Sequence, residues 1–127
     1  MRRLYFVMMF LLCASAIEAQ PLHRIDPNLA KTLEQLGDDG LAQVIIVMAD
    51  QVDVNGMGQA FGSVHASKDV RHYRVVTALQ EKASATQRPI LQYLADQQGA
   101  GAVERFEPMW IVNMVFAAAT KRTILDL

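Results

Sequence analysis

The side chains of this 127-residue chain whose types and spacing come nearest to a catalytic or metal site are Ser63, three histidines and a short acidic stretch. Ser63 precedes His65 by two positions, as a nucleophile beside a general base would, but no nucleophile-elbow motif and no orienting carboxylate at a recognisable spacing accompanies them. His65 and His72 are too far apart in sequence to bind one metal from a single helical turn. We therefore expect exposed histidines here, and neither a catalytic nor a metal site.

The segment 50–67 combines acidic residues and glycines, and two kinds of site can be tested against it. Asp50, Asp53 and Asn55 resemble the start of a calcium loop, but Phe61 stands where such a loop needs its twelfth-position glutamate. The glycines are not followed by the Lys-Ser or Lys-Thr pair of a phosphate-binding loop, and their spacing does not match a dinucleotide-binding motif. The segment is predicted to be a solvated loop, with no cofactor and no metal.

The first 19 residues have the layout of a secretory signal peptide. Two arginines precede an apolar run over residues 4–16, which is shorter than the roughly 20 apolar residues that span a bilayer. Cleavage after Ala19 would leave Gln20 as the new N-terminus, and cleavage after Ala16 is the alternative. A signal predicts export to the periplasm or the extracellular space with no membrane attachment after its removal, whereas an uncleaved anchor is the competing interpretation.

The mature chain is weakly acidic and has no cysteine, because Cys13 leaves with the signal. Removing Arg2, Arg3 and Glu18 reduces the 12 basic and 13 acidic residues to 10 and 12, a net charge of −2. Such a balance provides no basic surface for nucleic acid. A disulfide and a thiol nucleophile are excluded as well.

The periodicity of apolar residues predicts a helix-rich first half of the mature chain. Residues 20–40 form a leader with a short helix that begins at Asp26-Pro27, an N-cap followed by proline at the first helical position. The β-branched run 43–49 predicts a strand. Residues 69–98 have helical spacing, and Pro89 either divides them into two helices or bends a single one.

The second half is predicted to contain two strands and the start of a helix. A strand over 103–106 is interrupted at Glu107-Pro108, a longer strand covers 110–119, and a helix starts at Lys121. Between Trp110 and Ala119 every residue is apolar except Asn113, although a half-buried strand should alternate. One long or broken helix can cover one face of this strand, which leaves a patch of roughly 500 Å². We therefore expect another folded protein to cover the second face.

Side-chain size assigns the two faces of this strand. The bulky residues are expected to face the domain's own helices, whereas the smaller set, which includes the one polar residue, is expected to face the partner. The predicted core face consists of Trp110, Val112, Met114 and Phe116, and the predicted partner face of Ile111, Asn113 and Val115. The alternative for Asn113 is that its amide bonds internally to a neighbouring turn.

The order of these segments resembles the prosegment of bacterial subtilisin-like serine proteases. The resemblance is carried by QVIIVMADQVDV, by the long helical segment with Ser84-x-x-Gln87, and by the strand with Trp110-x-x-Asn113. It covers about residues 25–127. It implies an α+β, ferredoxin-like fold, an antiparallel sheet with helices on one face, in which residues 41–127 form the prosegment domain.

The resemblance also implies a function, that of an intramolecular chaperone and inhibitor whose open sheet face docks onto the protease domain. The chain carries none of the catalytic motifs of that domain, so it is expected not to be an enzyme. The likeness ends at Leu127, before the fourth strand, which in this fold lies beside the first, so we expect a domain truncated before its last strand. The alternative is a free-standing exported inhibitor or a protein-binding module that pairs through its sheet.

Overall fold

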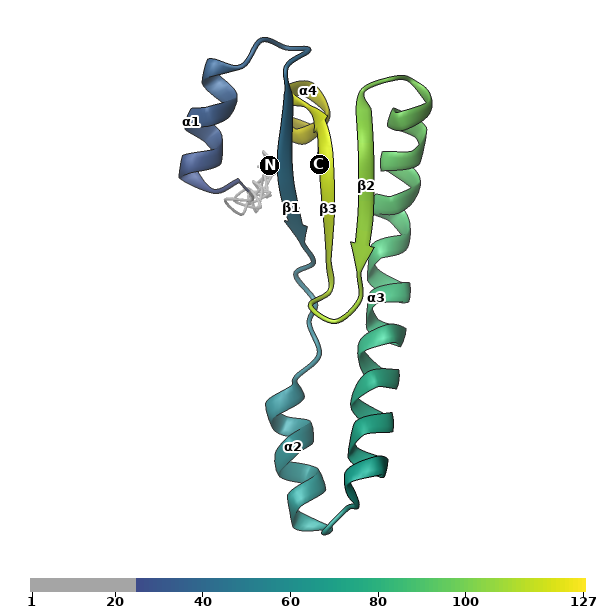
Figure 1. Cartoon of the computed structure of the whole chain (residues 1–127). Helices are drawn as coiled ribbons and strands as arrows, with labels where there is room; N and C mark the ends of the chain where they lie inside the picture. Colours follow the sequence, from purple (N-terminus) through teal and green to yellow (C-terminus); the bar gives the residue numbers. More distant parts are fainter. Residues whose placement is uncertain (1–24) are drawn as a thin grey trace, which may run out of the picture.

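The computed structural model describes residues 25–127, which form helices and strands (Figure 1). In chain order these are α1 (Pro27–Gln35), β1 (Leu41–Val47), α2 (Val54–Ser63), α3 (Lys68–Gly99), β2 (Val103–Met109), β3 (Met114–Thr120) and α4 (Lys121–Leu125). The predicted signal peptide, residues 1–19, and its cleavage site between Ala19 and Gln20 lie outside the described residues.

β3 is the central strand of an antiparallel sheet, with β1 along one side and β2 along the other. Ala117 of β3 lies opposite Val44 of β1 and opposite Phe106 of β2, so these three residues share one face of the sheet. The prediction of an α+β fold with an antiparallel sheet is confirmed.

The hydrophobic core lies on one face of the sheet only. It contains residues from all three strands together with one buried side chain from each of α1, α3 and α4: Leu33, Val44, Leu94, Val103, Val115, Ala117, Ala119 and Ile124. The strand members of this set alternate along β3, as a strand with one covered face requires. The helices therefore pack against a single face, and the other face is left without a layer of its own in the described residues.

Helix α1 begins where the sequence predicts. The Asp26 carboxylate accepts hydrogen bonds from the backbone N–H groups of Asn28 and Leu29, and Pro27 occupies the first helical position, where a missing N–H costs nothing. Leu33 is buried in the core, with Leu29 and Leu36 packed beside it. The short leader helix is thus part of the folded domain.

The loop predicted over 50–67 is wrong, because its middle forms helix α2. The Asp53 carboxylate caps this helix by accepting a hydrogen bond from the Gly56 N–H at 2.9 Å. A Cβ atom at position 56 would collide with that carboxylate, so a larger residue here would displace the capping side chain. Each glycine in a helix costs about 1 kcal/mol relative to alanine. The three glycines in α2 therefore weaken the helical signal of the apolar spacing of Val54, Met57 and Phe61.

The long helical segment is one helix, α3, which runs through Pro89 without a break. The proline ring is exposed, and the buried residues Ala83, Gln87 and Leu94 lie on both sides of it along the chain. Packing of this one stripe against the sheet offsets the roughly 3 kcal/mol that an internal proline costs. The N-terminal part of α3 and the whole of α2 extend beyond the end of the sheet (Figure 1).

The strand boundaries at the β2–β3 hairpin also differ from the prediction. β2 continues through Pro108, which is tolerated because β2 is an edge strand whose outer N–H groups need no partner. β3 starts only at Met114, and residues 110–113 form the turn. Trp110, Ile111 and Val112 therefore belong to a turn, where strand alternation does not apply.

The final helix, α4, follows β3 directly. Thr120 is its N-cap and accepts a hydrogen bond from the Thr123 N–H at 3.4 Å. Its buried residue Ile124 joins the core.

Burial raises the pKa of the Tyr93 phenol on α3 above its ordinary value, and the negative charge of Asp126 acts in the same direction.

Candidate protein-binding face

The face of the sheet opposite the core carries a set of side chains that we call the open face, most of them exposed or half-buried, with Ala118 buried among them. Because residues opposite each other in an antiparallel pair share a face, the register groups them into rows. Ile45, Phe116 and Glu107 form the middle row, and Val47, Met114 and Met109 form the row next to the β2–β3 turn. The third row consists of Gln43, Ala118 and Arg105, and Leu41 lies at the far end of β1.

The open face is apolar in its centre and is shaped as a shallow groove. Ile45 in the middle of β1 and Val47 at its end are 61% and 65% exposed, so two large apolar side chains on one face are open to water. The groove has a volume of about 450 Å³ and is lined by Ile45, Arg105, Phe106, Glu107, Met109, Met114 and Phe116. A contiguous apolar surface of this kind is typical of sites that bind another protein.

Charged side chains border the apolar centre on the β2 side. The Arg105 guanidinium lies over the Phe116 ring at 5.3 Å from its centroid, a distance at which a cation is attracted to the ring. Glu107, on the same strand, is exposed beside it. An apolar centre with a charged border is the usual composition of a protein–protein interface.

The sequence-based assignment of the two strand faces is wrong. Asn113 and Val115, assigned to the partner, are 1% and 0% exposed and face the core side. Met114 and Phe116, assigned to the core, lie on the open face. Trp110 and Val112, also assigned to the core, are 37% and 45% exposed in the turn, and Ile111 is exposed there too.

The reason for this reversal is the closeness of the helix layer to β3. Val115, Ala117 and Ala119 are small enough for the helices to approach the strand, so the smaller side chains lie inside and the bulkier ones outside. The expectation that one face of this strand has no cover from the chain's own helices does hold for the described residues. The residues on that face are different from those expected.

Asn113 is the centre of a buried polar cluster. Its amide nitrogen donates to the Asp50 carbonyl at 2.7 Å and lies 3.0 Å from the Thr86 hydroxyl, while its side-chain oxygen accepts from the Gln87 amide at 3.0 Å. The Gln87 amide also lies within 3.3 Å of the Met109 and Met114 carbonyls. The alternative interpretation, in which Asn113 bonds internally, is confirmed as to the internal bonding, but its side-chain partners are on α3 and in the segment after β1 rather than in a neighbouring turn.

The backbone of Asn113 takes part in the same cluster. Its carbonyl accepts from the Met48 N–H at 3.1 Å and from the Gln51 amide at 3.2 Å. Its φ of +41° is in the left-handed region, which asparagine tolerates better than most residues. The cluster joins the end of β1, the middle of α3 and the β2–β3 turn, so it sets the geometry of the open face from behind.

The two short motifs behind the family resemblance meet in this cluster. Gln87 closes the first motif, Asn113 closes the second, and their side chains are bonded to each other. Ser84, which opens the first, is exposed on α3. The second half of α3, strand β2 and part of the turn separate these two amide residues in the sequence, and one sequence alone does not pair them.

The side chains first considered for catalysis have structural roles or are exposed. The Ser63 hydroxyl donates to the Ala60 carbonyl at 2.8 Å, and His65 and His72 are both exposed. The Asp50 carboxylate pairs with the Lys82 ammonium at 2.7 Å. Over residues 25–127, no three side chains of the metal-binding types come together.

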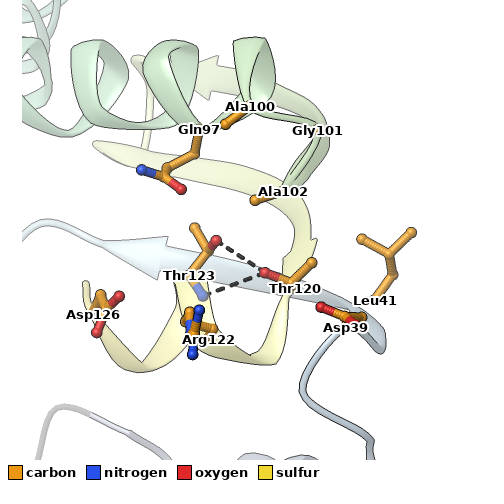
Figure 2. A pocket seen from close by; sticks show the side chains of 10 residues that line it. All are labelled: Asp39, Leu41, Gln97, Ala100, Gly101, Ala102, Thr120, Arg122, Thr123 and Asp126. Carbon is orange, nitrogen blue, oxygen red and sulfur yellow. Dashed lines mark hydrogen bonds between the residues drawn. The ribbon is translucent and has the colours of Figure 1, made fainter.

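A second hollow, of about 460 Å³, lies where β1 starts and α3 ends (Figure 2). Thr120 and Thr123 line it, and their hydroxyls lie 3.0 Å apart, bonded to each other at the start of α4. The charged residues around it, Asp39, Arg122 and Asp126, come from two chain segments at its rim. Since its hydroxyls are used in capping α4, we assign it no chemistry.

Neither the models of protein families, nor the curated proteins, nor the solved structures contain a match. Among the helices of residues 25–127, none is both long and apolar enough to cross a lipid bilayer.

Proposed function

We propose that this chain is the N-terminal prosegment of an exported subtilisin-like serine protease, and that it acts as the chaperone and inhibitor of the protease domain. The observation that carries the proposal is the open face, a groove with apolar residues at its centre that the helices of the described chain leave uncovered. The order of elements from β1 to α4 agrees with the start of a β-α-β-β-α-β ferredoxin-like fold, with α2 as an added helix. The strand order β1-β3-β2 agrees with it as well.

The open face is suited to bind the flat surface made by two neighbouring helices. Four apolar side chains project from two strands that are hydrogen-bonded to each other: Ile45 and Val47 from β1, and Met114 and Phe116 from β3. Because the backbone beneath them is already ordered, little conformational entropy is lost on binding. Removing these side chains from water provides the driving force, at about 25 cal/mol per Å² of apolar surface. Arg105 and Glu107 would select a partner with complementary charges at the border.

Chaperone activity follows from this contact, and inhibition follows from the same contact together with a peptide that occupies the substrate cleft. A rigid sheet that binds the native arrangement of two protease helices also stabilises the folding transition state in which they have already come together. The barrier to folding is then lower, as in any process whose transition state is bound more tightly than its starting state. In the resulting complex the protease domain stays bound to the open face of this chain. Catalysis itself would belong to the protease domain.

The test is inhibition of a subtilisin-family protease by the full chain. We expect inhibition of peptide hydrolysis with a constant below about 1 µM, equivalent to about −8 kcal/mol of binding free energy, and faster recovery of activity after denaturation of the protease. A serine protease of the chymotrypsin fold is the control, because it shares the chemistry but not the surface helices. Absence of both effects, or equal inhibition of the control enzyme, would refute the proposal.

The bare outer edge of β1 favours a second candidate, an exported module that binds proteins by adding a strand to its sheet. In the described residues β1 pairs with β3 on one side and with no strand on the other. Such a module would bind through its edge rather than its face. Loss of binding on substitution of an edge residue, with no loss on substitution of Phe116, would favour this candidate.

A further inference from the structure

Helix α2 and the first half of α3 lie outside the hydrophobic core. Along the chain, the apolar residues that form the core or pack against it pass from Ile46 of β1 directly to Ile90 of α3. Within the described residues, α2 has no buried side chain, and the first buried residue of α3 is Ala83. Both helices project past the end of the sheet in Figure 1. The burial that holds the sheet together therefore does not extend to α2.

The hydrogen bonds of this region separate α2 from the sheet just after Gln51. The Asn113 amide donates to the Asp50 carbonyl at 2.7 Å, and the Gln51 amide donates to the Asn113 carbonyl at 3.2 Å. The chain is thereby fixed to the β2–β3 turn up to Gln51. Over residues 52–66, by contrast, each hydrogen bond in the described structure joins two residues of that same segment. Val52 and Asp53 thus connect an anchored strand end to a helix without such anchors.

Three local features make α2 a weak helix. It has 10 residues, fewer than the roughly 12–15 that an isolated helix needs in water. A Cβ atom at Gly58 or Gly62 would meet no atom within 4 Å, so no close approach compensates for the low helix propensity of these glycines. His65, directly after the C-cap, has a φ of +50°, a left-handed conformation that is less favourable for histidine than for glycine. Neither its own sequence nor the core therefore stabilises α2 strongly.

We propose that α2 opens and refolds on its own, about a hinge at Val52 and Asp53, while the sheet, its core and the open face stay folded. Segments of low local stability are those from which lids and switch elements are drawn. Opening exposes Met57 and Phe61, the half-buried apolar residues of α2, to water. The open face does not change, because the anchors at Asp50 and Gln51 precede the hinge. The proposal does not depend on the protease function.

Hydrogen exchange of the full chain, followed by mass spectrometry, measures the opening of each segment separately. We expect the backbone amides of α2 to exchange at least about 100-fold faster than those of residues 115–119 in β3. The amides of α2 need only local opening, whereas those of the central strand need unfolding of the core. Exchange of α2 at the same rate as β3 would overturn the proposal, since the two elements would then unfold as one unit.

Gly58 allows two opposite changes at one position. Gly58→Ala adds a Cβ atom in open space and raises the helix propensity, so the amides of α2 should exchange about 5-fold more slowly than in the wild type. Gly58→Pro breaks the helix, so the same amides should exchange as in an unfolded peptide. In Gly58→Pro the amides of β3 should stay protected, with exchange less than about 10-fold faster than in the wild type, because the core does not include α2.

The Ala95→Pro variant is the matched control. Ala95 is exposed on α3, as Gly58 is on α2, but it follows the core residue Leu94, so a break in the helix here should remove the protection of β3 as well. Loss of β3 protection in Gly58→Pro to the same extent as in Ala95→Pro would overturn the proposal. Exchange of α2 that is unchanged in both Gly58 variants would also overturn it, because opening would then not depend on the helix.

Discussion

Replacing Asn113 with leucine should lower the free energy of unfolding by about 3–5 kcal/mol. The substitution removes one of the three acceptors of the Gln87 amide and the side-chain donor to the Asp50 carbonyl, both of which lie in the cluster behind the open face. A buried group that loses its hydrogen-bond partner costs about 1–3 kcal/mol. Leucine also tolerates the observed φ of +41° poorly, which adds about 1–2 kcal/mol.

Urea denaturation followed by circular dichroism measures this loss, with two variants to separate its causes. Asn113→Gly keeps the backbone conformation but removes the amide, so it should show most of the loss that comes from hydrogen bonding. Gln92→Leu makes the same kind of change on the exposed side of α3 and should alter stability by less than about 0.5 kcal/mol. An Asn113→Leu midpoint equal to that of the wild type would mean that the cluster does not hold the hairpin in place.

Replacing Phe116 with glutamate should weaken inhibition of the protease about 100-fold. Phe116 is in the middle of the central row of the open face, between Ile45 and Glu107, where interface residues contribute most. Burial of a phenylalanine side chain contributes about 1.5–3 kcal/mol, and a carboxylate without a partner in its place adds a desolvation cost. Each 1.4 kcal/mol of lost binding free energy is about tenfold in affinity.

The folding of the Phe116→Glu variant should be nearly unaffected. Phe116 lies outside the buried core, and the Arg105 guanidinium that now covers its ring can pair with the new carboxylate. Gln92→Glu makes the same change of charge on the helix side and should leave the inhibition constant unchanged. Inhibition constants for the two variants that agree within a factor of two, with both proteins folded, would show that the open face is not the docking surface.

The parts of the fold that could be predicted from the sequence are those with local signals. Asp26-Pro27 marks the start of α1, the β-branched run of β1 marks a strand, and the apolar stripe of α3 marks a long helix. Helix α2 was missed because its glycines reduce the helical signal, while the Asp53 cap was counted as part of an acidic loop.

The residues of the open face could not be predicted, because they depend on register. A shift of one residue moves a side chain to the opposite face of a sheet, and the register of β3 is set by the turn at 110–113. If residues 110–113 are taken as strand, side-chain size is the only basis for assigning the two faces of β3. The contact between Gln87 and Asn113, which would have placed Asn113 inside, joins residues from distant segments that no local pattern relates.

Photo-cross-linking tests most directly whether the open face lies against a protease. The photoreactive analogue p-benzoyl-phenylalanine replaces Phe116 in one variant of the full chain and Gln92, on the exposed side of α3, in another. After irradiation with a subtilisin-family protease, we expect a covalent complex from position 116 and none from position 92. A complex that forms through position 92 alone, or equally through both, would contradict docking through the open face.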